Sequence, residues 1–380
     1  MVRLAGATAE GADRPSGRQR DTAVVTSLPA HVADRVDRVL REFLAGQRDR
    51  LGAIAADMAP VVDAAVEFLA GGKRLRPAFA YWGWRGAGGE ESGPAADAMV
   101  AAASSLELLH ASALLHDDVM DGSDTRRGRP TAHRRFAALH RDSGWSGSPE
   151  SFGAAAAILL GDLCLMWSTE LLHGCGLDHA AVHRGLAVYD RMCGELIAGQ
   201  YLDVLEQARG AGTVEAALRV ARYKTAAYTV ERPLHLGARL AGGSAELLAA
   251  YSGYGAAIGE AYQLRDDVLG VYGDPARTGK PAGDDLREGK RTVLVALAAL
   301  RSPPADAAEL HRLLGDPALS PAGVTTLREL ISASGALAEM EMMITERVGR
   351  GLDALATGPV EPAAAQALRD LAVAATARSG

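Results

Sequence analysis

Residues 97–121 read DAMVAAASSLELLHASALLHDDVMD, and this stretch indicates the fold class. It contains neither proline nor glycine, and most positions before Asp117 are apolar or small. A helix that is apolar on most of its faces is normally central in a bundle, because each face needs a neighbour to cover it. The stretch therefore predicts a central helix over residues 97–120 of an all-α protein.

The same helix ends on an acidic cluster, Asp117, Asp118 and Asp121. At about 100° per residue, Asp117 and Asp121 point the same way and Asp118 lies a quarter-turn away. A second pair, Asp266 and Asp267, lies in another apolar helical stretch, YQLRDDVLG. Adjacent carboxylates repel each other, and burying them is costly unless a cation binds there. Two such clusters predict a divalent metal such as Mg²⁺, which takes oxygen ligands and leaves positions open for substrate phosphate.

Ordinary solvated carboxylates are the alternative at each acidic site. For the first cluster, the apolar residues upstream, SSLELLHASALLH, argue against a solvated helix end. For Asp284 and Asp285, in the loop after the second pair, a solvated loop is the favoured interpretation. His116 and Glu107 are interpreted as structural residues of the central helix.

Cationic residues flank both clusters. Guanidinium groups form forked hydrogen bonds with phosphate oxygens, and lysines in glycine-rich loops approach phosphates closely. No nucleotide P-loop pattern accompanies them. We predict that three sets of residues bind diphosphate: Arg126 and Arg127; Lys280 and Lys290; and Lys73, Arg74 and Arg76 of GGKRLRP. For GGKRLRP, a surface turn with ordinary charges is an equal alternative.

The rest of the chain has the same helical character. Apolar residues recur at spacings of three and four, and alternating strand patterns are scarce. Helices are also predicted at 31–51, 153–173, 180–207, 213–230, 244–272, 291–301, 323–350 and 362–377. Glycine, proline and serine predict loops at 86–94, 141–150, 273–285 and 301–306. We predict one domain of about ten or more helices over residues 29–380, after a disordered tail at 1–28.

Composition excludes several classes of protein. The 380 residues carry a net charge of −7, which argues against a nucleic-acid surface. Three cysteines without metal-finger spacing fit a reduced, cytoplasmic setting better than a disulfide framework. No uninterrupted apolar run approaches the roughly 18–20 residues of a spanning helix, and the amino terminus lacks the apolar core of a signal peptide.

Taken together, these segments resemble the trans-isoprenyl diphosphate synthases, also called polyprenyl synthetases. The family's motifs occur in order: GGKRLRP, ELLHASALLHDDVMD followed by RRGRP, the pair Lys224–Thr225, QLRDD, and TGKPAGDD. The resemblance covers about residues 30–350 and is nearest to actinobacterial geranylgeranyl diphosphate synthases. It implies the isoprenoid synthase fold, a helical bundle around a central substrate cavity, and a homodimer.

The resemblance also implies a role for each matching residue. The Mg²⁺ ions, three per active site, are held by Asp117, Asp121 and Asp266, with Asp118 and Asp267 in support. Isopentenyl diphosphate is bound by Lys73, Arg76, His110 and Arg127. The allylic diphosphate (dimethylallyl, geranyl or farnesyl) is bound by Arg126, Lys224, Lys280 and Lys290. The developing allylic cation is faced by Thr225 and Gln263. Without the family's motif, His110 would be interpreted as a core histidine.

One position departs from the family pattern. Gly270 stands where the second motif often carries a third aspartate, and glycine cannot bind metal. The second metal site is therefore expected to be weaker than the first, with activity retained.

The small residues upstream of Asp117 bear on product length. The resemblance implies that Ser112 and Ala113 face the growing chain and that Leu109 and Leu106 form the next floor. Small side chains there let the chain pass a farnesyl length. Geranylgeranyl diphosphate is the expected product, with longer prenyl chains as the alternative.

Two other classes of protein are weaker alternatives. A class I terpene cyclase would usually carry an Asn/Ser/Glu metal motif late in the chain, which is absent, and would have no use for GGKRLRP. A non-catalytic subunit of a heteromeric synthase tends to lose its aspartates, and both pairs are intact here.

Overall fold

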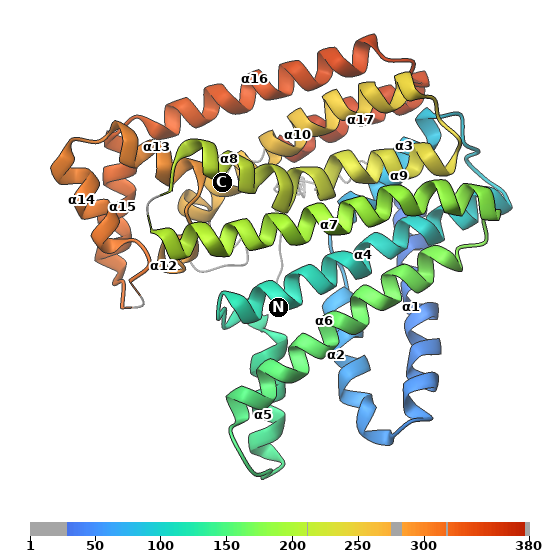
Figure 1. Ribbon diagram of the computed structural model, residues 1–380, viewed down its shortest axis with the longest axis horizontal. Helices are drawn as coiled ribbons and strands as arrows, with labels where there is room; N and C mark the ends of the chain where they lie inside the picture. Colours follow the sequence, from blue (N-terminus) through green and yellow to red (C-terminus); the bar gives the residue numbers. More distant parts are fainter. Residues whose placement is uncertain (1–28, 211, 275–282, 317, 377–380) are drawn as a thin grey trace, which may run out of the picture.

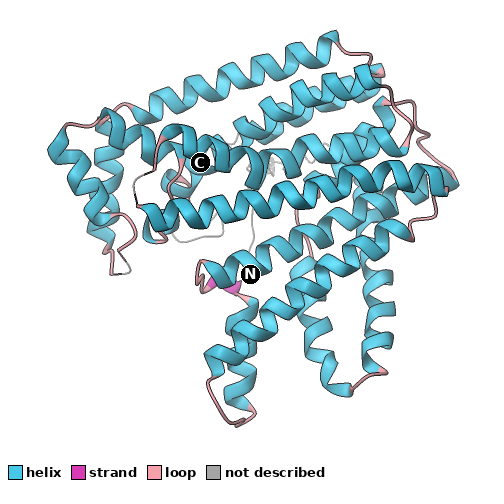
Figure 2. Ribbon diagram, viewed as in Figure 1, coloured by secondary structure: helices cyan, strands magenta, loops and turns pink. Residues whose placement is uncertain are grey.

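The computed structural model describes residues 29–210, 212–274, 283–316 and 318–376, and these residues are almost entirely helical (Figures 1 and 2). The exception is a short antiparallel hairpin of β1 (Thr125–Arg126) and β2 (Arg129–Pro130). The all-α prediction is confirmed. The tail predicted at 1–28 and Lys280 lie outside the described residues.

The helices of the described residues follow one another with short connections. In the amino-terminal half they are α1 (Ala30–Gly52), η1 (Ala56–Met58), α2 (Ala59–Leu69), α3 (Leu75–Gly86), α4 (Pro94–Met120), α5 (Ala132–Asp142), α6 (Pro149–His173) and α7 (His179–Arg209). In the carboxyl-terminal half they are α8 (Val214–Val220), η2 (Ala221–Glu231), α9 (Arg232–Leu240), α10 (Ala245–Tyr272), α12 (Asp284–Arg287), α13 (Val293–Arg301), α14 (Pro304–Leu313), α15 (Pro321–Ala333), α16 (Ala336–Thr357) and α17 (Pro362–Thr376).

Most predicted helices are confirmed to within a few residues, and two predictions are wrong. The range 323–350 is two helices, α15 and α16, because Gly335 adopts a φ of 77° that breaks the helix. The range 213–230 is α8 followed by η2, which is a π-helix. The loop predicted at 301–306 is short, since Pro304 begins α14. Helices α2, α3, α5, α9, α12 and α14 were not predicted.

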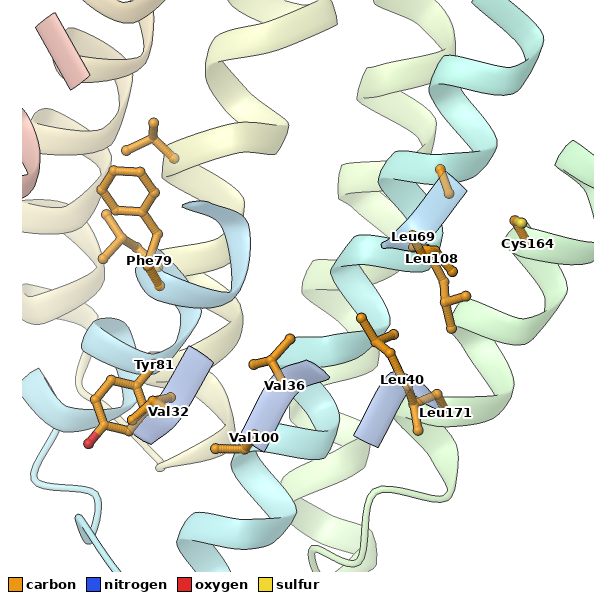
Figure 3. Close-up of a cluster of buried hydrophobic side chains, with 14 of the residues drawn as sticks. Val32, Val36, Leu40, Leu69, Phe79, Tyr81, Val100, Leu108, Cys164 and Leu171 are labelled. Carbon is orange, nitrogen blue, oxygen red and sulfur yellow. The ribbon is translucent and has the colours of Figure 1, made fainter. Parts of the chain in front are cut away.

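The central helix is α4, as predicted. It packs on α1, α3, α6 and α9, and from Val100 to Leu109 almost every side chain is buried. One side of it meets a large apolar cluster that includes Val36, Leu40, Phe79 and Leu108 (Figure 3). Asp117 therefore lies near the end of a long, largely buried helix.

The π-helix η2 is held between α7 and α10, and glycines on both helices let its backbone approach. A Cβ atom on Gly199 of α7 would lie 2.3 Å from the backbone nitrogen of Lys224. A Cβ atom on Gly259 of α10 would lie 2.7 Å from the carbonyl oxygen of Ala226. A π-helix is wider than an α-helix and is common at functional sites. Close glycine contacts fix the backbone that carries Lys224 and Thr225.

Arg74 anchors the segment GGKRLRP to the bundle. Its φ is 49°, and its buried guanidinium donates to Glu107 Oε2 at 2.6 Å, Asp37 Oδ1 at 2.9 Å and the Leu69 carbonyl oxygen at 2.7 Å. These three acceptors come from α1, α2 and α4. Arg74 is therefore structural, and Glu107 has the structural role that the sequence indicated.

His235 of α9 should make the fold sensitive to mild acid. Burial, together with repulsion from the neighbouring Arg232, lowers the pKa of His235 to about 4. Nδ1 lies 3.1 Å from Arg232 Nη1, and Nε2 lies 3.1 Å from the Leu248 carbonyl oxygen. The unfolded chain takes up a proton near pH 6.5 and the folded protein does not. Stability should therefore fall between pH 6.5 and 4, by as much as about 3 kcal/mol.

We expect His235→Gln to flatten this dependence when the unfolding midpoint is measured across that pH window. His173→Gln, at an exposed histidine of α6, is the matched control and should follow the unmodified protein. An unchanged slope in His235→Gln would contradict the assignment.

Candidate active site

A cavity of about 230 Å³ lies where α4, α7, η2 and α10 meet. Its walls carry both aspartate clusters, several cations and a few apolar side chains. The polar and charged lining residues are Arg76, His110, Asp117, Arg126, Gln200, Asp203, Lys224, Thr225, Tyr228, Tyr262, Gln263, Asp266, Asp267, Asp285, Lys290, Arg291 and Thr292. The apolar ones are Ala113, Leu114, Leu196, Ala217, Val220 and Ala221.

Each carboxylate of the first cluster faces its own cation. Lys224 Nζ lies 2.9 Å from Asp117 Oδ1. Arg126 Nε donates to Asp118 Oδ1 at 2.7 Å. Lys290 Nζ lies 3.3 Å from Asp121 Oδ2. The three cations come from η2, β1 and the segment before α13, so the cluster joins three distant parts of the chain.

Two residues from α7 complete the surroundings of Asp117. Gln200 Nε2 donates to Asp117 Oδ1 at 2.9 Å. Asp203 Oδ2 lies 2.5 Å from Lys224 Nζ, so this lysine is shared between two carboxylates. Neither residue was identified from the sequence, because both lie on an unremarkable amphipathic helix about 80 residues from Asp117.

The acidic residues differ in the direction in which their surroundings shift their pKa values. Burial alone would raise the pKa of Asp117, but Lys224 and Lys290 outweigh it and lower the pKa to about 2. For Asp118 and Asp121, burial prevails and the pKa is raised despite the adjacent cations. Asp117 is therefore the most firmly ionised member of the first cluster.

The second cluster lies opposite, on α10. Asp266 is exposed, and Asp267 is buried and accepts a hydrogen bond from Gln263 Nε2 at 2.6 Å. Burial, together with the negative charges of Asp285 and Asp266, raises the pKa of Asp267 to about 8. The interpretation of Asp285 as a solvated loop residue is wrong. It is partly buried and lines the cavity, since the turn after Gly283 folds back onto α10. The side chain of Asp284 lies outside the described part of the chain.

A group of guanidinium and imidazole side chains gathers around Tyr228. Arg76 stacks 4.2 Å over the ring of Tyr228, whose hydroxyl lies 3.0 Å from Nδ1 of His110. Burial and the adjacent Arg76 and Arg127 lower the pKa of His110 well below its usual value, so the imidazole is neutral. Partial desolvation together with repulsion from Arg126, Arg74 and Arg76 also lowers the pKa of Arg127, although this residue is exposed to solvent. This concentration of positive charge suits an anion.

Two orphaned nitrogen atoms support an anionic ligand. The buried Nε atoms of Arg76 and Arg291 have no hydrogen-bond partner in the described residues, and both side chains line the cavity. Buried donors are nearly always satisfied, so an unpaired one in a cavity fits a ligand oxygen. Arg291 was not among the predicted site residues.

The structure brings most of the predicted residues together. Eleven of them line the cavity: Arg76, His110, Ala113, Asp117, Arg126, Lys224, Thr225, Gln263, Asp266, Asp267 and Lys290. Asp118 and Asp121 do not line it but pair with the lining residues Arg126 and Lys290. Lys73 and Arg127 are exposed and do not line the cavity, and Ser112 and Leu109 are buried in α4 without lining it.

The donors fit magnesium that arrives with a diphosphate. All candidate ligands are carboxylate oxygens, which suit a hard cation. No group of three or more acidic, histidine or cysteine side chains among the described residues is already arranged to hold a metal. Mg²⁺ is commonly held by one or two carboxylates together with substrate phosphates. The arrangement therefore fits an ion that is bound jointly by aspartates and ligand.

An all-α bundle with two facing acidic clusters and a lining of lysine and arginine defines a class of protein, the metal-dependent enzymes that act on diphosphates. The family profile described as polyprenyl synthetase matches residues 59–331. The chain belongs to the polyprenyl synthetase family and is a trans-prenyltransferase.

Individual relatives agree with this assignment. A solved geranylgeranyl pyrophosphate synthase from Corynebacterium glutamicum, complexed with isoprenyl diphosphate and magnesium, is 43% identical with a TM-score of 0.88, covering 92% of this chain and 99% of its own. A geranylgeranyl diphosphate synthase of Mycobacterium tuberculosis is 35% identical over 75% of each chain. A geranylfarnesyl diphosphate synthase of Aeropyrum pernix is 32% identical over 88% of this chain and 96% of its own.

Proposed function

We propose that this enzyme condenses isopentenyl diphosphate head-to-tail with an allylic diphosphate and makes geranylgeranyl diphosphate. The observation that carries the proposal is the cavity between two acidic clusters, with cations on both walls. The relatives include synthases of geranylgeranyl and geranylfarnesyl chains, so product length is proposed on other grounds below.

Two groups of cationic side chains would bind two different diphosphates. The allylic diphosphate is assigned to Arg126, Lys224 and Lys290, which lie next to the acidic clusters, and to Lys280, which lies outside the described residues. Isopentenyl diphosphate is assigned to Lys73, Arg76, His110 and Arg127. Supporting this division, Arg126, Lys224 and Lys290 each contact a carboxylate of the first cluster, whereas Arg76 and His110 both contact Tyr228.

Three Mg²⁺ ions are assigned to Asp117, Asp121 and Asp266, with Asp118 and Asp267 in support. When bound, magnesium supplies the positive charge that stabilises diphosphate as a leaving group. Lys224 would turn from Asp117 toward the diphosphate as the carboxylate takes a new partner. Thr225 and Gln263 place oxygen dipoles beside the allylic carbon, where positive charge develops. The apolar walls exclude water, which would quench that cation.

The direct test is incubation of the purified protein with isopentenyl diphosphate, Mg²⁺ and each of three allylic starters, dimethylallyl, geranyl and farnesyl diphosphate. Chromatography of the dephosphorylated products should show geranylgeraniol. Elongation of none of the starters would overturn the proposal, and a longer main product would correct its chain length.

Product length is proposed to depend on the wall of the cavity below Asp117. Ala113, one turn before Asp117, lines the cavity together with Leu196. Leu196 also belongs to a buried apolar cluster with Leu106 and Leu109. The growing chain would therefore extend past Ala113 toward this cluster, which forms the floor.

We expect Ala113→Phe to shift the main product from geranylgeranyl to farnesyl diphosphate, because the ring would fill the path beside Leu196. Products are identified by chromatography at equal substrate conversion. Ser112→Phe places the same ring on the buried neighbouring residue, which does not line the cavity, and tests how far the wall extends. Unchanged products from Ala113→Phe would contradict the assignment.

A homodimer is proposed through α6 and α7. Two helices of the described residues are long and apolar enough to cross a membrane, α4 and α6. The most apolar window of α4 is 78% buried in the bundle, whereas that of α6 is only 39% buried. Large apolar side chains are exposed on α6 and α7: Ile158, Leu159, Met166, Ile197, Tyr201 and Val204. A surface of this kind marks an interface, and a second copy offers the same surface in return.

In solution we expect a mass of twice 39.5 kDa by light scattering, and a shift toward the monomer in Leu159→Glu combined with Ile197→Glu. The control is Leu300→Glu, which changes an even more exposed leucine on α13. A monomeric unmodified protein at micromolar concentrations would contradict the proposal.

We also propose a cytoplasmic location, which agrees with the three free cysteines.

A further inference from the structure

The two acidic clusters differ at one position. In the first, Asp117 and Asp121 are separated by one helical turn and present two carboxylates along one edge of α4. In the second, Asp266 has the same relation to Gly270 on α10, which has no side chain. Helix α10 alone therefore supplies one carboxylate fewer along this edge than α4 does.

The space beside Gly270 is occupied by a residue of another element. A Cβ atom built on Gly270 would lie 1.7 Å from Oδ2 of Asp285 and 2.7 Å from its Cγ. The carboxylate of Asp285 thus occupies the volume that a side chain at position 270 would take. A side chain at 270 and the present position of Asp285 exclude each other.

Asp285 is held in this place by its own turn. Its carbonyl oxygen accepts a hydrogen bond from the Lys290 backbone nitrogen at 3.0 Å. The next residue, Leu286, is 1% exposed and packs in the apolar cluster that contains Val268 and Val271 of α10. These contacts fix α12 against α10, so the carboxylate is positioned by a packed element.

Lys290 is shared among three carboxylates. Lys290 Nζ lies 2.7 Å from Glu288, 3.3 Å from Asp121 and 3.9 Å from Asp285. The lysine therefore links Asp285 to the first acidic cluster. Asp285 directs Oδ2 at α10, one turn from Asp266, and lines the cavity.

We propose that Asp285 supplies the carboxylate absent from position 270 and acts with Asp266 on the magnesium ion of the second cluster. The inference rests on the proposed function. Mg²⁺ at such a site needs only one or two carboxylates besides phosphate and water, and a carboxylate from α12 serves as well as one from α10. The second cluster is therefore assembled from two elements, whereas the first comes from one helix.

Four variants separate this proposal from a purely structural role. Asp285→Ala removes the carboxylate. Gly270→Ala leaves the charge but places a methyl group where the carboxylate lies. Gly270→Ala with Asp285→Ala tests whether the two changes act on one interaction. Gly270→Asp with Asp285→Ala returns a carboxylate to the same space from α10.

The readout is binding of inorganic diphosphate by calorimetry at increasing Mg²⁺, with the Mg²⁺ dependence of turnover as a second measurement. We expect each single variant to need about tenfold more Mg²⁺, the size of effect seen when groups around a metal site are removed. The double alanine variant should be no worse than either single variant, since coupled changes are not additive. Gly270→Asp with Asp285→Ala should recover most of the loss.

Asp274→Ala is the matched control, because Asp274 is an exposed carboxylate just beyond α10 that does not line the cavity. It should leave the Mg²⁺ requirement unchanged. If Asp285→Ala unfolds by circular dichroism, Asp285→Asn replaces it. A normal Mg²⁺ requirement in the folded Asp285 variant, or no recovery by the exchanged aspartate, overturns the inference. An unmodified protein that binds no diphosphate with Mg²⁺ overturns the proposed function instead.

Discussion

Asp117→Asn should lower kcat by about 10²–10³-fold, the size of effect seen when one group that stabilises transition-state charge is removed. The Asp117 carboxylate lines the cavity and contacts both Lys224 and Gln200. Asparagine keeps the size of the side chain but cannot bind magnesium as an anion. The measurement is steady-state turnover at saturating substrates and Mg²⁺.

The loss in Asp117→Asn should be the same at pH 6 and pH 8. The pKa of Asp117 is lowered to about 2, so the carboxylate is ionised throughout this range. Its contribution to folding is present above the ordinary value near 3.8 and disappears only as the pH falls toward 2. The matched control is Asp97→Asn, at the exposed start of α4, where turnover should not change. A loss of less than tenfold in Asp117→Asn would contradict the assignment of Asp117 to the reaction.

Glu107→Ala should destabilise the protein by about 3–5 kcal/mol, because it leaves the buried charge of Arg74 without its nearest partner. The side chains of Arg74 and Glu107 are only 6% and 8% exposed. Burial would lower the pKa of Arg74, but Glu107 outweighs it and the pKa is raised. The free energy of unfolding from urea titration measures the effect.

Glu107→Gln is the graded control for this prediction. It keeps an oxygen acceptor for Arg74 Nη1 but removes the charge, and we expect a loss of about 1–3 kcal/mol. Asp97→Asn, at an exposed ion pair with Arg35, should cost less than about 1 kcal/mol. A loss below 1 kcal/mol in Glu107→Ala would show that Asp37 and the Leu69 carbonyl oxygen suffice for Arg74.

The sequence predicted those parts of the fold that depend on local pattern. The apolar run before Asp117 identified the central helix, and the two aspartate pairs identified both walls of the cavity. The π-helix was missed because apolar spacing over 213–230 indicates a helix without specifying its hydrogen-bond pattern. That pattern depends on close contacts with Gly199 and Gly259, which are remote in sequence.

The missed site residues share a similar cause. Gln200 and Asp203 belong to a helix whose orientation is set by tertiary packing, so nothing local connects them with Asp117. Asp285 was interpreted as a loop residue because its relation to Gly270 exists only after α12 packs on α10. Residue type and motif order identified the chemistry, but the partner of each charge required the fold.

The carboxyl-terminal helix α17 supports the helix that carries the second acidic cluster, so changes at this end of the protein affect the site. Arg265, directly before Asp266, donates to the Thr376 carbonyl oxygen at the end of α17 at 2.9 Å and to Glu341 of α16 at 2.6 Å. Tyr254, on the same helix as Arg265, donates to the Leu368 carbonyl oxygen at 2.6 Å. Trimming α17, or fusing a bulky partner directly after Thr376, would loosen the helix that carries the second acidic cluster. An affinity tag is better placed at the amino terminus.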